Sequence, residues 1–596
     1  MRIRLIFAVL SILSLAAAVH AADRPRPFED VVNDAQERGV IDREEALLSR
    51  FRFVFAPERV APVLAVENVL PIKSLTRAVW EYEEGKAGFR ASTVEEIEGY
   101  LRGDSGAGKT AAYTYDSPSG HFRLTYETIG TNAVPTEDVN PANGIPDYVE
   151  KVAIYCDSSW TREVDELGFH APALEPGEKY SISFENMGAY GYTTSDGHGG
   201  SAIVIENNFV GFPPNDDPEG DQLGAAKVTC AHEFKHATQM NTTGGMSMGG
   251  WIELDAVWAE DVVFDESNDY YNYFGYNDGI TTPALSLDDG GSGTYEDAIW
   301  QHFLCEKWGI GMGLALMNRR EIEPAETVPN SYEAIIGDQG MSFQDAFAEF
   351  ATWNYLTAGR ANDDIPCYGE ADTYPLGMVY ATVDAYPHEA TDVISRMSAH
   401  PYRIRSLGDL TGALRVIFDG SNFQRVTALY RRDAAYGGGW FREDIPLDSL
   451  NQADQTLALP AEQTAQLVVI VVNGKKRSDP TSYTIRFEDG TVQTGVGSAV
   501  PVALPFGLEP NRPNPFNPTT TIDFRLPAEA STSLLVYNPA GRLVRTLIGG
   551  ESLPAGGHSV RWDGSDDSGR DAASGVYYYR LTSGERTETR RMVLIR

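Results

Sequence analysis

The chain has 596 residues, enough for several hydrophobic cores, and at roughly 150 residues per domain we expect about four structural units. Its hydrophobic fraction of 42% and aromatic fraction of 11% exclude a largely disordered chain. The formal net charge of -37 disfavours binding to nucleic acid, which needs clustered Lys and Arg, and adsorption to anionic membranes.

The first 21 residues predict an exported protein. Arg2 and Arg4 precede the apolar run from Leu5 to Val19, and Ala21 supplies the small residue after which a signal peptidase cuts. The run is too short for a comfortable membrane span, and no later stretch reaches about 18 apolar residues. We therefore expect residues 1–21 to be a signal peptide, and the mature chain to pass the periplasm and be secreted or surface-attached, without a membrane span.

The rest of the chain divides by its hydrophobic pattern. Residues 22–110 are charged and helical, and they are interpreted as an N-terminal lobe or a propeptide, two alternatives that the sequence leaves open. Strand-like segments at 121–130, 179–187 and 201–209, followed by helical spacing from Leu223 to about Ala358, predict an α+β domain over residues 111–384. Beyond it we expect three further regions: a β-sandwich at 385–490, a linker at 491–507 and a small β-module at 508–596.

The sequence leaves open whether the four cysteines are free thiols or form disulfides. Cys156, Cys230, Cys305 and Cys367 permit two disulfide bridges in three pairings, and buried free thiols are the alternative. Cys230 lies on a predicted buried helix, where we expect a free thiol.

The motif with the clearest chemistry is HEFKH, residues 232–236. On a helix, His232 and His236 lie on one face because they are four residues apart, so both imidazoles can hold one metal ion. Glu233 lies one position along, where its carboxylate can take a proton from a water activated by that ion. The alternative is a core helix with two hydrogen-bonded histidines.

A catalytic zinc site needs a third protein ligand and an open position. Position 242, where the HExxHxxGxxH pattern has its third His, is Thr242. The next predicted helix, at 251–261, offers Glu253 and Glu260, which follow His236 by 17 and 24 residues. Spacing alone leaves both carboxylates open as the third ligand.

The motif and the helix after it resemble the gluzincin-type zinc metalloproteases. Glu253, Ala256, Trp258 and Glu260 match the segment E-(G/A)-x-A-x-(W/Y)-x-E that opens the second helix in that group. The resemblance implies a zincin-like fold, a Zn2+ cofactor, Glu253 as third ligand and Glu260 as a group behind the ligands. Leu254 departs from the usual small residue after the ligand.

Residues from about 120 to 360 also resemble a family of secreted bacterial metalloproteases in which an NGxPDYV segment precedes the zinc helix. Here the segment is part of EDVNPANGIPDYVE, at 137–150. The side-chain oxygens of Asp138, Asn140, Asn143 and Asp147 surround a glycine turn and suit a calcium ion. A plain Asn/Pro turn with a helix cap is the alternative.

These resemblances imply a secreted zinc-dependent endopeptidase that hydrolyses protein or peptide substrates, with Glu233 as general base. Tyr295 and His302, near a later helix, are candidates for the donor that stabilises the oxyanion. The competing hypothesis is a surface binding or adhesion protein in which a zincin fold has lost catalysis. The intact HEFKH motif argues against that hypothesis.

The C-terminal module carries three recognisable pieces. They are NRPNPFNP at 511–518, the turn WDG at Trp562–Gly564 and the strand ASGVYYYR at 573–580. Together they resemble the C-terminal sorting domains of type IX secretion, which share an Ig-like fold with flagellar hook-capping proteins. The resemblance implies recognition by a secretion machinery, and a generic Ig-like adhesion or spacer domain is the alternative. The predicted fold class is therefore multi-domain: an α+β zincin-like domain, an all-β sandwich and a C-terminal Ig-like β-sandwich.

Overall fold

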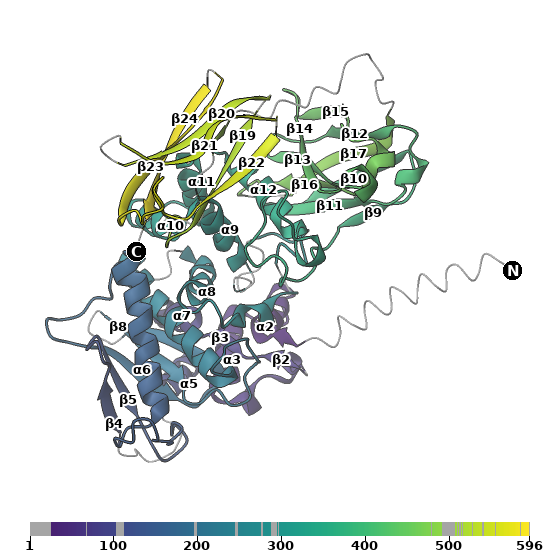
Figure 1. Ribbon diagram of the computed structural model, residues 1–596. Coiled ribbons are helices and arrows are strands. Elements are labelled where there is room, and N and C mark those ends of the chain that lie inside the picture. Colours follow the sequence, from purple (N-terminus) through teal and green to yellow (C-terminus); the bar gives the residue numbers. More distant parts are fainter. Residues whose placement is uncertain are drawn as a thin grey trace. The chain divides into compact units, whose positions relative to one another are not determined.

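The computed structural model (Figure 1) describes residues 25–66, 68–102, 112–195, 200–244, 248–275, 278–287, 295, 297–477, 480–490, 507–508, 511, 514, 516–526, 529–538, 542–554, 556–584 and 586–594. The predicted signal peptide and nearly all of the predicted linker at 491–507 lie outside these residues. The chain forms two compact units, one comprising the residues up to Phe303 with Gly313–Thr491, the other Leu304–Met312 with Val492–Arg596. In the part described, no helix is long and apolar enough to cross a bilayer.

The N-terminal region is a set of short helices joined by three small strands. The helices are α2 (Phe28–Glu37), α3 (Arg43–Phe55), α4 (Thr76–Gly85) and α5 (Ala91–Leu101). The Asp42 side chain caps α3 by accepting a hydrogen bond from the backbone N–H of Glu45 at 2.8 Å. Strands β1 (Arg26–Pro27) and β2 (Val69–Leu70) pair in parallel, and β3 (Ile72–Ser74) joins a larger sheet.

That larger sheet is mixed and, over the described residues, has the order β3-β7-β8-β6-β5-β4. Its other members are β4 (Tyr113–Asp116), β5 (Phe122–Tyr126), β6 (Tyr180–Glu185), β7 (Ala189–Ser195) and β8 (Ser201–Glu206). Strands β5, β6 and β8 run parallel to one another, whereas β7 is antiparallel to β8 and β3 is parallel to β7. The sequence predictions of β5, β6 and β8 are confirmed. Strand β7 was not predicted, because Gly191 and the polar end of AYGYTTS break the apolar pattern, although its Tyr and Thr residues favour a strand.

Two long helices cover this sheet and build its core. Helix α6 (Asp147–Trp160) continues through a π-helical turn, Thr161–Glu166, and α7 (Asp221–Thr243) carries the HEFKH motif. Their apolar faces pack on β5, β6 and β8, with Val149, Val152 and Phe234 buried in one cluster. Cys156 of α6 and Cys230 of α7 are free thiols whose sulfur atoms lie 3.4 Å apart. The free thiol expected at Cys230 is confirmed.

More helices follow the Gly-rich turn after α7. Helix α8 (Trp251–Val263) packs directly against α7 (Figure 1). The later helices are α9 (Ala298–Trp308), α10 (Gly311–Ile322), α11 (Val328–Asp338) and α12 (Phe343–Tyr355). The predicted helical character of the region from Leu223 to about Ala358 is therefore confirmed.

Two sheets that share one hydrophobic core form the next part of the first unit. The sheet orders in the described part are β10-β17-β12-β15 and β14-β13-β16-β11-β9. The strands are β9 (Ala381–Val383), β10 (His388–Ile394), β11 (Ser398–Ile404), β12 (Ala413–Asp419), β13 (Gln424–Arg432), β14 (Trp440–Ile445), β15 (Gln452–Thr456), β16 (Thr464–Asn473) and β17 (Thr481–Gly490). Alternating residues such as Val416 and Phe418 on β12 face this core, as their period of two requires.

The C-terminal module is a second pair of sheets. Its described strands have the orders β18-β19-β22 and β21-β20-β23-β24. They are β18 (Gly507–Leu508), β19 (Thr520–Leu526), β20 (Ala530–Tyr537), β21 (Leu543–Leu553), β22 (Gly556–Trp562), β23 (Gly575–Ser583) and β24 (Arg586–Leu594). Trp562, from the WDG turn, is fully buried and contacts Phe516 and Tyr577. The prediction of a multi-domain chain of helices and several β-sheets is confirmed.

Candidate metal centre

Helix α7 brings the two imidazoles of the HEFKH motif together. The Nε2 atoms of His232 and His236 lie 3.1 Å apart, and the ring centroids are separated by 4.7 Å. Both side chains are buried, because the small residues Ala225, Ala226 and Ala237 let α7 pack closely on the sheet. The i, i+4 spacing therefore directs both imidazoles at one point, as the sequence predicts.

Helix α8 adds a carboxylate to the same point. Glu253 Oε2 lies 3.0 Å from His232 Nε2 and 3.4 Å from His236 Nε2. Glu260, two turns further along α8, reaches the other side of the first ring, with Oε1 2.6 Å from His232 Nδ1. Of the two carboxylates that the spacing left open, Glu253 is the one that converges with both Nε2 atoms.

The three converging atoms fit a zinc ion. Ligand atoms about 2.0–2.2 Å from a tetrahedral zinc lie about 3.3–3.6 Å from one another, close to the three separations of 3.0, 3.1 and 3.4 Å. Glu233 Oε1 and Glu253 Oε1 are buried, and neither has a hydrogen-bond partner among the residues that the structure describes. Such orphaned buried oxygens are costly unless another group satisfies them.

Each histidine is also oriented through its outer nitrogen. His232 Nδ1 pairs with Glu260, and His236 Nδ1 lies 2.9 Å from Gln239 Oε1, so the Nε2 atoms of both rings face the shared point. Gln239 is itself fixed, since its Nε2 donates to Asp255 Oδ2 and to the Ile252 carbonyl, each at 3.0 Å. Gln239 was not predicted from the sequence. Its position three residues after His236 places the two side chains next to each other on a helix and could have indicated this contact.

The carboxylate of Glu233 lies beside the histidines and is fixed through one oxygen. Its Oε2 accepts hydrogen bonds from the hydroxyls of Thr76, at 2.7 Å, and Thr193, at 2.8 Å. A ligand atom of Glu233 lies within 4.8 Å of those of His232 and His236. The unpaired Oε1 is thus the oxygen left to accept a proton.

Charges at the centre are strongly coupled. Burial lowers the pKa of His232, but Glu253 and Glu260 outweigh burial and raise it to about 10. Burial raises the pKa of Glu253, but His236 and His232 outweigh it and lower it to about 2. Glu253 is therefore ionised at neutral pH, as a metal ligand must be.

A buried lysine from the N-terminal region extends this network. Lys73 Nζ lies 2.8 Å from Glu260 Oε2 and also forms an ion pair with Asp269, which accepts a hydrogen bond from the Tyr190 hydroxyl at 3.1 Å. Lys73 is about 160 residues before the motif in sequence, and no local pattern predicted its role.

The two predicted oxyanion donors occupy different surroundings. The Tyr295 ring lies 6.3 Å from the His232 ring, and its hydroxyl contacts the backbone N and O of Ser74 at 3.1 and 3.3 Å. His302 instead stacks on Tyr270, and burial lowers its pKa to about 4. Of the pair, Tyr295 is the one whose ring lies near a histidine of the motif.

The predicted calcium residues organise a turn. Asp138 accepts hydrogen bonds from the backbone of Asn143 and Gly144 at 3.0 and 2.7 Å, and Asp147 accepts from the backbone of Asn140 at 3.1 Å. Both carboxylates accept backbone N–H groups of the turn, as the alternative interpretation expects, but neither caps α6, and calcium binding there stays a prediction. In the described part of the chain, His232, Glu233 and His236 offer ligand atoms within 4.8 Å of one another.

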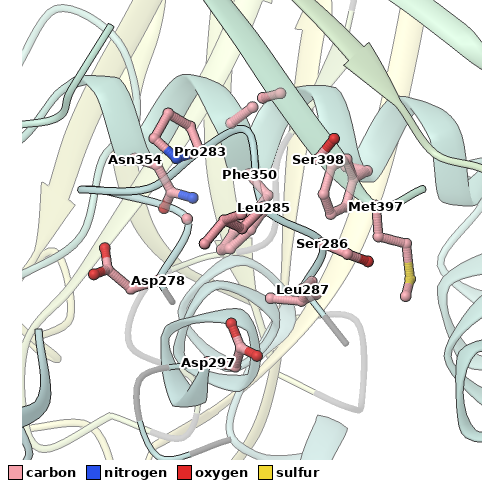
Figure 2. Close-up of a pocket in the computed structure, with 14 residues that line it drawn as sticks. Asp278, Pro283, Leu285, Ser286, Leu287, Asp297, Phe350, Asn354, Met397 and Ser398 are labelled. Atoms are coloured by element: carbon pink, nitrogen blue, oxygen red, sulfur yellow. The ribbon is translucent and has the colours of Figure 1, made fainter. Parts of the chain in front are cut away.

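A separate pocket lies between the loop at 278–287, α12 and the start of β11 (Figure 2). Leu285, Leu287, Phe350 and Met397 give it apolar walls. Its lining shares no residue with the metal centre.

Comparison with known proteins identifies one part of the chain. Residues 513–586 match the FlgD Ig-like domain family, which confirms an Ig-like domain at the C-terminal end. No curated protein matches the chain.

Two solved structures from Porphyromonas gingivalis are similar over limited segments. PorZ, described as an essential bacterial surface component of the type-IX secretion system, is 26% identical over 19% of this chain and 14% of its own, with a TM-score of 0.12. Dimeric latent PorU is 12% identical over 33% of this chain and 22% of its own, with a TM-score of 0.14. The chain thus spans less than a quarter of either protein, and TM-scores this low support no conclusion about its fold or function.

Proposed function

We propose that the protein is a secreted zinc-dependent endopeptidase with a zincin-like catalytic unit. The observation that carries this proposal is the convergence of His232 Nε2, His236 Nε2 and Glu253 Oε2 within 3.4 Å of one another, beside a fixed Glu233. The arrangement of a motif helix on a mixed sheet, followed by a second helix with an acidic ligand, supports the same assignment.

The chemistry is hydrolysis of a peptide bond. His232, His236 and Glu253 would hold a zinc ion, which would supply Lewis acidity toward the substrate carbonyl and lower the pKa of a water molecule. Glu233 Oε1 accepts a proton from that water, and the hydroxyl group is added to the carbonyl carbon. Glu233 then gives the proton to the amide nitrogen as the C–N bond breaks, so that an acid and an amine leave.

The remaining side chains orient the reacting groups. Thr193, on β7, holds Oε2 of Glu233, so its Oε1 is the oxygen that exchanges protons. Glu260 and Gln239 hold the outer nitrogens of the two histidines and keep each Nε2 available as a ligand.

The proposal is tested by zinc content and peptidase activity of the purified chain. We expect about one zinc per chain by plasma mass spectrometry, and chelator-sensitive digestion of denatured casein. Glu233→Gln should retain zinc and lose the digestion, whereas Glu166→Gln, an exposed glutamate paired with Arg162, should retain both. Zinc binding with casein digestion unchanged in Glu233→Gln contradicts the mechanism, and zinc without any digestion in any variant favours the surface binding protein.

We propose a sorting role for the C-terminal Ig-like domain. The match of residues 513–586 to the FlgD Ig-like family and the PNPFNP and WDG segments support it. A chain that ends at Thr491 should accumulate in the periplasm of the native host, whereas the full chain should reach the surface or medium. Normal secretion of the truncated chain would refute the sorting role.

A further inference from the structure

The reacting groups of the proposed enzyme are closed off from solvent. His232, Glu233, His236 and Glu253 expose at most 2% of their surface. A polypeptide substrate must place a backbone carbonyl next to these side chains, so the described conformation cannot admit one. Some part of the chain has to move before catalysis.

One short stretch, residues 72–80, contacts the centre. Thr76, the first residue of α4, donates its hydroxyl proton to Glu233 Oε2 and accepts a hydrogen bond from the backbone N–H of Thr193 at 2.7 Å. The ring of Trp80, one turn further along α4, meets the His236 ring edge-on at a centroid distance of 5.8 Å. One helix end therefore contacts both the general base and a metal ligand.

The strand before α4 takes the place where an extended peptide can add to the sheet. β3 pairs in parallel with the edge of β7, with Ser74 opposite Gly191, and the Leu75 backbone N–H donates to the Gly191 carbonyl at 3.0 Å. Main-chain pairing with a sheet edge is a common way to bind an extended peptide. Ser74 also uses its backbone N and O to contact the hydroxyl of Tyr295, whose ring lies 6.3 Å from that of His232.

A buried ion pair of Lys73 holds this stretch in place. Lys73 is 2% exposed and lies between Glu260 and Asp269. Separating a buried cation from its carboxylates without water to replace it is strongly unfavourable. The closed arrangement is therefore held at a point next to the metal ligands.

We propose that residues 72–80 are an internal occupant of the substrate site, which keeps the enzyme autoinhibited until the N-terminal region is displaced. This inference rests on the proposed peptidase function. The ligand that it assigns to the site is an extended peptide bound along β7. In the described structure, residues 72–80 take the position of that peptide. Turnover by the full chain is then the residual activity of the fraction in which the stretch has moved away.

The alternative is that Thr76 belongs permanently to the catalytic machinery, and a matched pair of variants separates the two. Thr76 and Thr193 both donate to Glu233 Oε2, but Thr76 lies on the covering stretch and Thr193 on β7. Replacing either by valine removes one hydroxyl and keeps the shape of the side chain. Loss of the Thr76 hydroxyl weakens the cover at Glu233 and at the Thr193 backbone N–H, whereas Thr193→Val leaves residues 72–80 with their own contacts.

The test uses the zinc-loaded full chain and two readouts. One is binding of a fluorescent peptide hydroxamate, measured by anisotropy, and the other is kcat/KM on a quenched peptide. Thr76→Val should bind the hydroxamate and cleave the peptide about tenfold better than wild type, the size expected for loss of one hydrogen bond to a charged group. Trp80→Ala should act in the same direction, and Thr193→Val should improve neither readout.

The outcomes distinguish this inference from the proposed function. If Thr76→Val and Trp80→Ala, both folded by circular dichroism, lose activity as Thr193→Val does, the stretch is part of the active enzyme and autoinhibition is wrong. Glu233→Gln in the Thr76→Val background should bind the hydroxamate without cleaving peptide. Absence of zinc from every variant refutes the peptidase assignment itself, and the autoinhibition with it.

Discussion

Glu260 Oε1 lies 2.6 Å from Nδ1 of His232, on the side of the ring opposite the metal-facing nitrogen. Glu253 Oε2 lies 3.0 Å from the Nε2 atom of the same ring, so the imidazole of His232 separates the two carboxylates. This division suits Glu253 to the proposed role of metal ligand and Glu260 to that of an orienting partner.

We expect the two carboxylates to differ in their effect on zinc affinity. Glu260→Gln should weaken zinc binding by about 10–100-fold, the usual effect of losing a group that orients a ligand histidine. Glu253→Ala should weaken it further, because a direct ligand is lost. Competition with a chromophoric chelator measures both constants. A larger loss in Glu260→Gln than in Glu253→Ala would reverse the two assignments.

Gln239 should matter for zinc although it is not a ligand. Gln239→Leu removes the acceptor for His236 Nδ1–H and is expected to weaken zinc binding by about 10–100-fold. Gln222→Leu, an exposed position near the start of the same helix, is the matched control and should keep wild-type affinity. Equal affinities in the two variants would show that the Gln239 bond does not orient the ligand.

Zinc binding should release a proton from His232. In the zinc-free chain its pKa is raised from 6.5 to about 10, so the stabilisation from its charged form is complete below pH 6.5 and is lost as pH rises through about 10. Zinc needs the neutral ring, so at pH 8 the proton must leave. Titration calorimetry in two buffers of different ionisation enthalpy should show release of about one proton. Identical heats in both buffers would contradict this.

Glu163 should destabilise the fold at alkaline pH. This residue of the π-helical turn is buried, and burial raises its pKa from 4.5 to about 8. Below pH 4.5 the carboxyl is neutral in both the folded and the unfolded chain, so it does not lower the free energy of unfolding. That free energy falls as pH rises from 4.5 to 8. Glu163→Gln should be more stable at pH 8.5 by an amount on the order of 2–5 kcal/mol, and close to wild type near pH 4.5.

Urea unfolding at the two pH values measures this difference. Glu166→Gln is the control, because Glu166 belongs to the same turn but is exposed and paired with Arg162. A pH-independent difference between Glu163→Gln and wild type would mean that Glu163 is not protonated in the folded chain near neutrality.

Much of the fold could be predicted because it depends on sequence patterns within single helices and strands. The i, i+4 histidines, the apolar faces of α6 and α7, and the alternating strands of both β-sandwiches depend on residues within one element. A short connection brings the next helix back against the first, which put both Glu253 and Glu260 within reach of the motif, and only the resemblance to gluzincins favoured Glu253. Strand β7 escaped prediction because its burial depends on neighbours rather than on its own composition.

The sequence by itself determined the kind of site: two histidines and a glutamate in one motif, an acidic helix after it and an Ig-like domain at the C-terminal end. Only the tertiary structure decided that Glu253 meets both Nε2 atoms, that Gln239 and Glu260 hold the outer nitrogens, and that residues 72–80 contact the centre. Lys73, Thr76 and Trp80 lie more than 150 residues before the motif. Contacts over such separations come from the packing of the sheet, and no periodicity within a segment encodes them.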